Sequence, residues 1–264
     1  MMPMAPDELP DAFRDVMGAV TGIRFPRQGD TADLALVDTT RGRFAIKRAR
    51  GRPFSAWIRR EARLLAALTK TPLPTPTLYA AMDEPEREQS WLLMEFLPGD
   101  SLRRMLAAEP EEHRRRELIY QYGAVLSQIH ACPVPEDLGP GDEGPWLERM
   151  LAEARYNLEH FPVDGTQELL VALTAKKPPP VTPTLIHGDF TLDNVLVLDG
   201  RITGVVDWSG GGIGDPRYDV ALAVRTKHPA FDKARDEEVF FQGYGRRMAS
   251  DRELEYFTDL YEFF

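Results

Sequence analysis

The chain has 264 residues, more than the roughly 100 to 200 typical of one domain, so we expect two lobes that share a cleft. Its residues are 43% hydrophobic and 28% charged, a composition that excludes disorder of the whole chain. The net charge of −10 disfavours broad binding to nucleic acids or anionic membranes, which need a basic surface, and favours cationic ligands.

The first part of the chain predicts a strand-rich lobe with one helix. Apolar residues recur at helical spacing over 54–68, which indicates an amphipathic helix of about four turns that ends before Pro72. Strand-like patterns occupy 34–47 as a hairpin, 79–82 and 91–97. The Leu-Pro-Gly segment marks the lobe boundary, which divides the chain into residues 1–97 and 98–264.

The second part predicts a mainly helical lobe with short strands around tight loops. Helical periodicity covers 111–130, 146–158, 167–175 and the region from about 215 onward. Prolines within 176–184 fix the backbone and remove hydrogen-bond donors, so this segment is expected to be an extended linker. Apolar, strand-like segments follow at 184–190, 194–199 and 202–208.

The strongest chemical signal is the segment HGDFTLDN at 187–194, which Asp207 follows within VVDW. Phosphoryl transfer needs a carboxylate at the acceptor hydroxyl and oxygen ligands for Mg²⁺. Asp189 can supply the carboxylate, and Asn194 and Asp207 can supply the ligands. Gly and Asp are also common turn residues beside strands, but here their order and spacing follow the protein-kinase catalytic set.

The segments HGDFTLDN and VVDWSGGGIGDPRYDVALA resemble the aminoglycoside phosphotransferases, and the resemblance covers nearly the whole chain. It implies an α+β, bilobal protein-kinase-like fold, with an antiparallel-sheet N-lobe (1–97) for the nucleotide and a mainly helical C-lobe (98–264) for catalysis, metal and acceptor. It also implies that ATP is the phosphate donor. Under the resemblance, Asp189 is the catalytic base or orienting carboxylate, and Asn194 and Asp207 are ligands of Mg²⁺.

Lys47 in FAIK occupies the place of the strand lysine that holds nucleotide phosphates in this fold. Glu61 lies on the apolar face of its helix, three residues after Ile58 and four before Leu65. A carboxylate among apolar neighbours needs a partner, and Lys47 is the expected counterion. The alternative is that Glu61 reaches solvent at the helix edge and that Lys47 is a surface residue.

Two further segments are candidates for nucleotide binding. RQGDTADLAL stands where a phosphate-covering loop is expected, although it has no GxGxxG or Walker pattern. Gly29 and Thr31 are its candidate phosphate contacts, and a hairpin cap is the alternative role for Thr31. WLLMEFLPG resembles the hinge between the lobes, where Met94 would guard the pocket and backbone groups of Glu95 and Leu97 would bind the adenine edge. A buried edge strand followed by a turn would give the same pattern.

Asp215 and Asp219 in GDPRYD also match positions of the family. Because aspartate at a helix N-terminus caps backbone N–H groups and interacts well with the helix dipole, both are interpreted as structural. His130 ends an amphipathic helix and is interpreted in the same way.

The ending DLYEFF resembles that of the aminoglycoside 3'-phosphotransferases, in which the terminal carboxylate and the glutamate two residues before it bind the cationic sugar. Acids within LAEARYNLEHFPVD lie where that family's substrate helix and loop supply further carboxylates, although an acidic helix can equally be a solvated face. Threonine follows Arg225 where antibiotic-binding members carry an Arg-Asp pair, so one substrate carboxylate is expected to be missing. The candidate substrate contacts are Glu153, Glu159, Asp164, Arg225, Glu262 and Phe264.

The chain is therefore expected to transfer phosphate from ATP, with Mg²⁺, to an aminoglycoside hydroxyl, the 3'-hydroxyl first among the candidates, and so to confer antibiotic resistance. A kinase for another small hydroxylated metabolite or for a macrolide is an alternative, because the resemblance fixes the phosphate chemistry better than the acceptor. A catalytically silent nucleotide-binding relative is a second alternative. Against silence stands the joint presence of Lys47, Glu61, Asp189, Asn194 and Asp207.

The single cysteine, Cys132, cannot form an internal disulfide and lacks the Cys or His neighbours of a zinc site, which fits a reducing compartment. Residues 1–15 lack the basic start and apolar run of a signal peptide, and no apolar stretch reaches the ~20 residues that span a bilayer. We expect a cytoplasmic monomer that binds neither nucleic acid nor membrane.

Overall fold

A computed structural model describes residues 4–26, 32–138, 144–225 and 230–264 of the chain. The chain forms two compact units: Met1–Pro98 with Gly204–Gly210, and Gly99–Thr203 with Gly211–Phe264. The boundary expected at residue 97 thus omits one segment of the first unit, which returns from far along the chain. That segment is held there because the Val205 N–H donates to the Pro74 carbonyl at 2.7 Å and Trp208 is fully buried.

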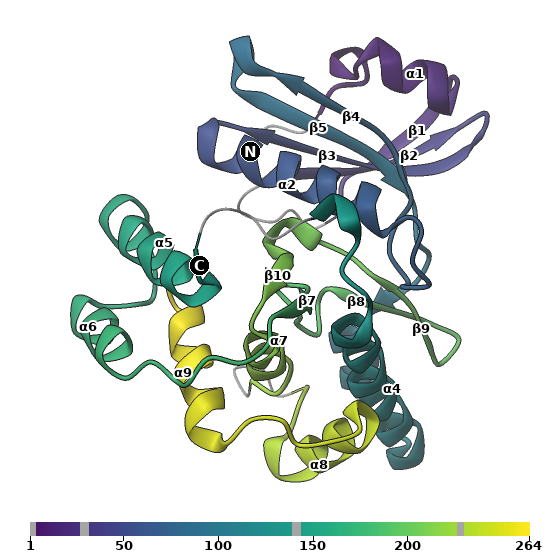
Figure 1. Cartoon of the computed structure of the whole chain (residues 1–264). Coiled ribbons are helices and arrows are strands. Elements are labelled where there is room, and N and C mark those ends of the chain that lie inside the picture. The colour runs from purple at the N-terminus through teal and green to yellow at the C-terminus, as the bar shows by residue number, and fades with distance from the viewer. Residues whose placement is uncertain (1–3, 27–31, 139–143, 226–229) are drawn as a thin grey trace. The chain divides into compact units, whose positions relative to one another are not determined.

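The first unit is a five-stranded antiparallel sheet with a helix on each face (Figure 1). Its strands, in the spatial order β1-β2-β3-β5-β4, are β1 (Val20–Arg24), β2 (Asp33–Thr39), β3 (Gly42–Arg50), β4 (Leu78–Glu84) and β5 (Gln89–Glu95). The helices are α1 (Asp11–Met17) and α2 (Arg52–Leu68). The predicted hairpin, helix and two further strands are confirmed, whereas β1 and α1 are not among the predicted elements.

The sheet of the first unit is buried from both sides. On one face, Phe13 and Met17 of α1 join a cluster with Ile46 and Trp91, in which the rings of Phe13 and Trp91 meet edge to face at 6.5 Å. The other face is covered by α2, whose residues Ile58, Leu64, Leu65 and Leu68 are buried. Because both faces are covered, β5 is buried along nearly its whole length, and the β3 residue Lys47 lies in the interior.

The second unit is mainly helical, as predicted. Its helices are α3 (Leu102–Ala108), α4 (Glu112–Ala131), α5 (Trp146–His160), α6 (Gln167–Ala175), α7 (Pro216–Ala223), α8 (Lys233–Tyr244) and α9 (Asp251–Tyr261). Its short strands are β6 (Asp100–Ser101), β7 (Thr184–Ile186), β8 (Val195–Leu198), β9 (Arg201–Val205), which ends in the first unit, and β10 (Gly212–Gly214). They form two small sheets, β6-β8-β9 and β7-β10. The proline-rich segment that follows α6 has no regular structure before β7, in agreement with the expected linker.

Helices α4 and α8 pack against each other at two glycines. A Cβ atom added to Gly123 of α4 would clash with the carbonyl oxygen of Phe240, and one added to Gly243 of α8 would clash with the carbonyl oxygen of Tyr120. Backbone atoms of a packed helix cannot move aside as a side chain can. The close approach of the two helices therefore requires glycine at both positions.

Gly123→Ala is expected to lower the free energy of unfolding by about 3 kcal/mol, because the added methyl group meets backbone in a packed core. Urea denaturation measures the loss. Gly22→Ala in β1 is the matched control, since a Cβ there lies 3.6 Å from Asp38, an ordinary van der Waals distance. We expect the control to change stability by no more than about 0.5 kcal/mol, and equal effects of the two substitutions would contradict the close approach.

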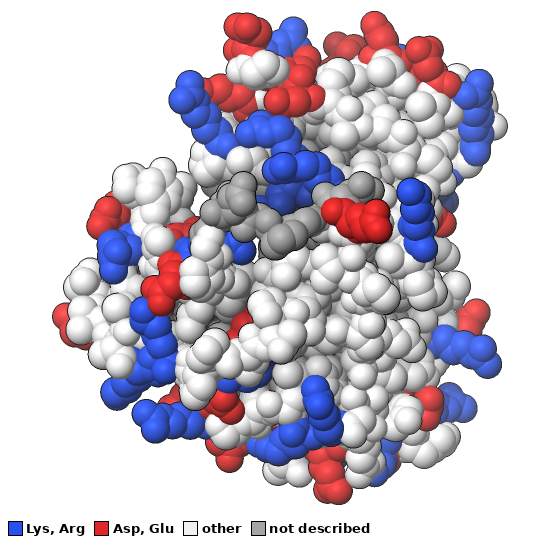
Figure 2. Space-filling model, viewed as in Figure 1, with Lys and Arg blue, Asp and Glu red and all other residues white. Residues whose placement is uncertain are grey.

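The molecular surface carries charges of both signs. Figure 2 shows acidic and basic side chains interspersed on one face of the molecule. Among the residues that the structure describes, no helix is both long and apolar enough to cross a membrane.

Candidate functional site

In the first unit, three charged side chains from distant parts of the sequence meet. The Lys47 Nζ of β3 lies 2.9 Å and 3.0 Å from the two carboxylate oxygens of Glu61, and 3.0 Å from Oδ1 of Asp207. Glu61 is 1% exposed and Lys47 is 8% exposed. The predicted contact between Lys47 and Glu61 is therefore present, and the alternative in which both reach solvent is wrong.

Two carboxylates in this cluster stabilise the positive charge of Lys47. Burial opposes the positive charge of Lys47, but Asp207 and Glu61 outweigh it and raise the pKa of the ammonium group. Burial raises the pKa of the Glu61 carboxyl, against the opposing effect of Lys47. The backbone N–H of Trp208 also donates to Glu61, at 3.2 Å. Lys47 thus stays protonated, with a fixed direction and two anionic neighbours.

Asp207 is held in an unusual backbone conformation just after β9. Its φ of 65° lies in the left-handed region, which residues other than glycine adopt only at a cost in conformational free energy. The hydroxyl of Ser209 donates to Asp207 Oδ1 at 3.0 Å, and the side chain is 43% exposed. The carboxylate is therefore oriented by its neighbours and still accessible to a ligand.

The residues expected at an adenine site lie at the end of β5 and after it. Met94 is buried, and Leu97 is half-buried in the segment that follows the strand. The Glu95 N–H donates to the Thr77 carbonyl at 2.9 Å, and the Glu95 carboxylate accepts from the Thr77 hydroxyl at 2.8 Å. These bonds commit the N–H and the carboxylate of Glu95, so its carbonyl is the group that could face an adenine.

The phosphate contacts expected at Gly29 and Thr31 lie outside the described residues.

In the second unit, the segment 187–194 forms a loop between β7 and β8 whose start is fixed by Asp219 of α7. The backbone N–H groups of His187 and Gly188 donate to the two oxygens of Asp219, at 2.6 Å and 2.8 Å. His130 also contacts this carboxylate, at 3.2 Å, and its other ring nitrogen lies 2.8 Å from the Tyr244 hydroxyl. His130 and Asp219 are therefore structural, as interpreted from the sequence, although Asp219 caps a loop rather than its own helix.

Asp215 is the N-cap of α7, as expected, because its side chain accepts from the Arg217 N–H at 3.0 Å. The middle of the loop is held by Tyr122 of α4, whose hydroxyl donates to the Phe190 carbonyl at 3.1 Å and whose ring stacks on that of Phe190. Burial raises the pKa of Tyr122 well above its usual value, so this hydroxyl stays a donor.

Asp189 projects from this loop with both carboxylate oxygens hydrogen-bonded. Asn194 Nδ2 donates to Oδ2 of Asp189 at 2.7 Å and to its backbone carbonyl at 2.8 Å. The Tyr261 hydroxyl donates to Oδ1 at 2.7 Å. Tyr261 is not among the residues predicted from the sequence, because it lies far along the chain and its only signal is its place beside Glu262.

A cavity of about 210 Å³ lies at this position. Its polar lining includes Asp189, Asn194, Arg103, Asp193, Arg225 and Tyr261. Two arginines and two aspartates thus balance in charge, and Arg103 is paired with Asp193 through two hydrogen bonds, at 2.5 Å and 2.6 Å. The cavity is polar without being strongly acidic.

Of the residues expected to bind the acceptor, some lie at the cavity beside Asp189 and others do not. Arg225 lines the cavity and forms an ion pair with Glu262, while its guanidinium lies 4.8 Å from the centre of the Tyr261 ring. Glu153 is half-buried. Glu159, Asp164 and Phe264 are exposed, and none of these last four residues is among those that line the cavity. Their roles stay predictions.

Each unit contains one donor group of the kind that binds a magnesium ion carried by nucleotide phosphates. Among the described residues, no group of three or more His, Cys, Asp or Glu could hold a metal by itself. Mg²⁺ bound through nucleotide phosphates needs only one or two protein ligands, preferably oxygens. Asn194 uses its amide nitrogen on Asp189, which leaves its oxygen end, and Asp207 offers an accessible carboxylate.

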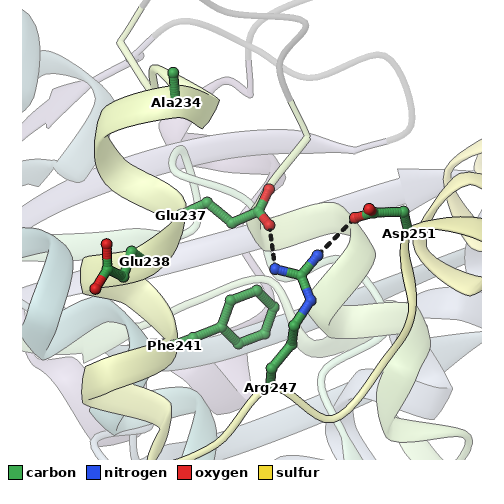
Figure 3. A pocket seen from close by; sticks show the side chains of 6 residues that line it. All are labelled: Ala234, Glu237, Glu238, Phe241, Arg247 and Asp251. Carbon is green, nitrogen blue, oxygen red and sulfur yellow. Dashed lines mark hydrogen bonds and ion pairs between the residues drawn. The ribbon is translucent and has the colours of Figure 1, made fainter.

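A second cavity, of about 540 Å³, is lined by none of the residues that the sequence predicts for the functional site (Figure 3). Arg247 lies between Glu237 and Asp251 there, with hydrogen bonds of 2.7 Å and 2.6 Å, and its guanidinium packs on the ring of Phe241. One guanidinium thus binds two of the three acidic side chains that line the cavity, so the lining is ion-paired but keeps a net negative charge.

Residues 22–254 match the profile of the phosphotransferase enzyme family. An aminoglycoside 3'-phosphotransferase of Streptomyces fradiae is 32% identical over 192 residues, which cover 66% of this chain and 68% of that protein. An aminoglycoside 3'-phosphotransferase of Niallia circulans is 27% identical over 243 residues, which cover 84% of this chain and 87% of that protein. The resemblance identified from the sequence motifs is confirmed.

The fold is likewise shared with a solved structure. A crystal structure of aminoglycoside-3'-phosphotransferase of type VIII matches with a TM-score of 0.74 at 22% identity, covering 96% of this chain and 98% of that one. This likeness confirms the expected protein-kinase-like fold.

Proposed function

The chain belongs to the phosphotransferase enzyme family, and from that premise we propose that it transfers the γ-phosphate of ATP to a hydroxyl group of an aminoglycoside antibiotic. The 3'-hydroxyl is the first candidate position, because two relatives are aminoglycoside 3'-phosphotransferases. Such a reaction would confer resistance to the drug. The observation that carries the proposal is the Asp189 carboxylate, oriented by two hydrogen bonds in a polar cavity of the second unit.

On the donor side, Lys47 binds the phosphates of the nucleotide. Its buried ammonium, held by Glu61, presents a fixed positive charge, and a lysine of this kind pairs with the α- and β-phosphates in kinase-like enzymes. The carbonyl of Glu95 and the backbone of Leu97 bind the adenine edge beside Met94. Gly29 and Thr31 stay candidate phosphate contacts from the sequence, because they lie outside the described residues. Asn194 and Asp207 are the residues that would hold Mg²⁺, which neutralises charge on the phosphates when bound.

On the acceptor side, Asp189 orients the hydroxyl and accepts its proton. As the new bond forms between the acceptor oxygen and the γ-phosphorus, the bond from that phosphorus to the β–γ bridging oxygen breaks and ADP leaves. Protein groups need do little covalent chemistry in such a reaction, so positioning supplies most of the rate. The carboxylates of Glu153, Glu159, Asp164 and Glu262, with the terminal carboxylate of Phe264, remain proposed contacts for the ammonium groups of the drug.

A kinase for another hydroxylated metabolite or for a macrolide is the second candidate. The cavity beside Asp189 favours it in one respect, because Arg103 and Arg225 balance Asp189 and Asp193 there. A strongly cationic acceptor gains less from such a lining than from an acidic one. The silent, nucleotide-binding alternative is disfavoured by the joint presence of the five residues that donor, metal and acceptor chemistry require.

Nucleotide-coupled assays decide among these functions. We expect ADP release with Mg-ATP and kanamycin B, but not with its 3'-deoxy analogue, which differs only at the proposed position. Mass spectrometry and NMR of the product would locate the phosphate. Release with both drugs would move the reaction to another hydroxyl. Release with macrolides or neutral metabolites alone would establish the second candidate, and tight nucleotide binding without any release would establish a silent relative.

A further inference from the structure

Two different side chains restrain the two carboxylate oxygens of Asp189. Asn194, five residues away in the same loop, donates to Oδ2, and Tyr261, at the end of α9, donates to Oδ1. Asn194 is explained by the proposed metal site, whereas nothing in the proposed reaction uses Tyr261. We infer that Tyr261 is a positioning residue, which acts through Asp189 by fixing the plane of its carboxylate; this inference rests on the proposed function.

Tyr261 is itself held from the face of its ring. The guanidinium of Arg225 lies 4.8 Å from the ring centre, within the range of a cation–π contact, and it is ion-paired with the neighbouring Glu262. The side chains of Arg225 and Glu262 are 13% and 17% exposed, so the pair is well shielded from solvent. Arg225 and Glu262, two of the six residues expected to bind substrate, thus also support the tyrosine.

The end of α9 is also anchored through its backbone. The Gly165 N–H donates to the Glu262 carbonyl at 2.8 Å, and Asn157 of α5 donates to the Phe263 carbonyl at 3.0 Å. The Phe263 side chain is fully buried and lies directly over Gly165, where any side chain would collide with its ring. The Tyr261 hydroxyl is therefore presented to Asp189 by a rigid segment rather than by a free chain end.

The consequence for catalysis is orientational. A carboxylate that accepts a hydrogen bond on one oxygen can still turn about its Cβ–Cγ bond. Donors on both oxygens, here one from the loop and one from α9, fix its plane and the directions of its remaining lone pairs. A general base must lie within hydrogen-bond reach and correct alignment of the proton that it accepts. Small losses of alignment at a reacting centre reduce the rate without weakening the binding of substrate.

Tyr261→Phe removes the hydroxyl and keeps the ring on which Arg225 packs. The inference predicts that kcat falls about 10- to 100-fold while the KM for the acceptor and for the nucleotide each stay within about 2-fold. Tyr256→Phe is the matched control. It lies on the same helix, and its hydroxyl also donates one hydrogen bond, but to the backbone carbonyl of Leu173, at 3.1 Å, and not to Asp189. We expect the control to leave kcat and both KM values unchanged.

An unchanged kcat in Tyr261→Phe would overturn the inference. A raised acceptor KM at constant kcat would do so too, because it would make Tyr261 a substrate contact. Equal losses of kcat in both variants would show a general effect of weakening α9, which thermal melting of each variant would register as well.

Two measurements test the role of Tyr261 independently of which acceptor the protein uses. The slow hydrolysis of nucleotide by water, measured without any acceptor, should fall in Tyr261→Phe by the same factor as the transfer reaction. A crystal structure of the variant should show the Asp189 carboxylate rotated away from its present plane, and an unmoved carboxylate would overturn the inference. If wild type transfers phosphate to no aminoglycoside, the proposed acceptor fails, while these two readouts still decide the role of Tyr261.

Discussion

Asp189→Asn is expected to reduce turnover by about 10³-fold, because the amide has the size of the carboxylate but cannot accept the proton of the acceptor hydroxyl. Nucleotide affinity should stay within about 2-fold, since the proposed phosphate contacts belong to other residues. Coupled ADP release measures turnover, and titration calorimetry with the nucleotide measures affinity. The two quantities together separate loss of chemistry from loss of binding.

The control for this substitution is Asp199→Asn. Asp199 is an exposed aspartate after β8 with a φ of 50°, a conformation that asparagine also tolerates. It makes the same chemical change without touching the cavity, and we expect wild-type turnover. If Asp189→Asn retained wild-type turnover, Asp189 would not be the base, and the proposed mechanism would have to be abandoned.

The loop 187–194 and its proposed role could be predicted from the sequence because the motif is local. Asp189 and Asn194 are five residues apart, so one loop carries both, and their order with Asp207 predicts phosphoryl transfer before any fold is known. The contact of Glu61 could be predicted by a different argument. Helical periodicity places it on an apolar face, and the cost of an unpaired buried charge then predicts its contact with Lys47, which the structure contains.

The contacts that could not be predicted depend on tertiary packing. Tyr261 lies 72 residues after Asp189 in the sequence, and no periodicity or spacing links the two. The ion pair of Arg225 with Glu262 is of the same kind, since each residue alone looks like a substrate contact. The segment 204–210 joins the first unit through Trp208 and Val205, although the chain reaches it from the second.

Lys47→Met is expected to destabilise the protein by about 3 to 5 kcal/mol, because it leaves the buried carboxylate of Glu61 without its cation. Burial already raises the pKa of Glu61, and the loss of Lys47 removes the opposing effect. A carboxyl whose pKa is raised in the folded state favours folding most when it is protonated, at a pH below its unfolded pKa. This contribution to the free energy of unfolding is lost as the pH rises through the folded pKa. The stability deficit, measured by urea denaturation, should therefore shrink as the pH falls toward 4.5.

The double variant Lys47→Met, Glu61→Gln separates stability from function. Glutamine removes the charge but keeps an oxygen to accept from the Trp208 N–H, so most of the lost stability should return, because a buried pair replaced by neutral groups is often tolerated. Nucleotide affinity and turnover should stay low, since no cation remains for the phosphates. Lys177→Met is the control: its ion pair with Glu148 is partly exposed, and its loss should cost less than about 1 kcal/mol. Recovery of turnover together with stability would show that Lys47 serves only the fold.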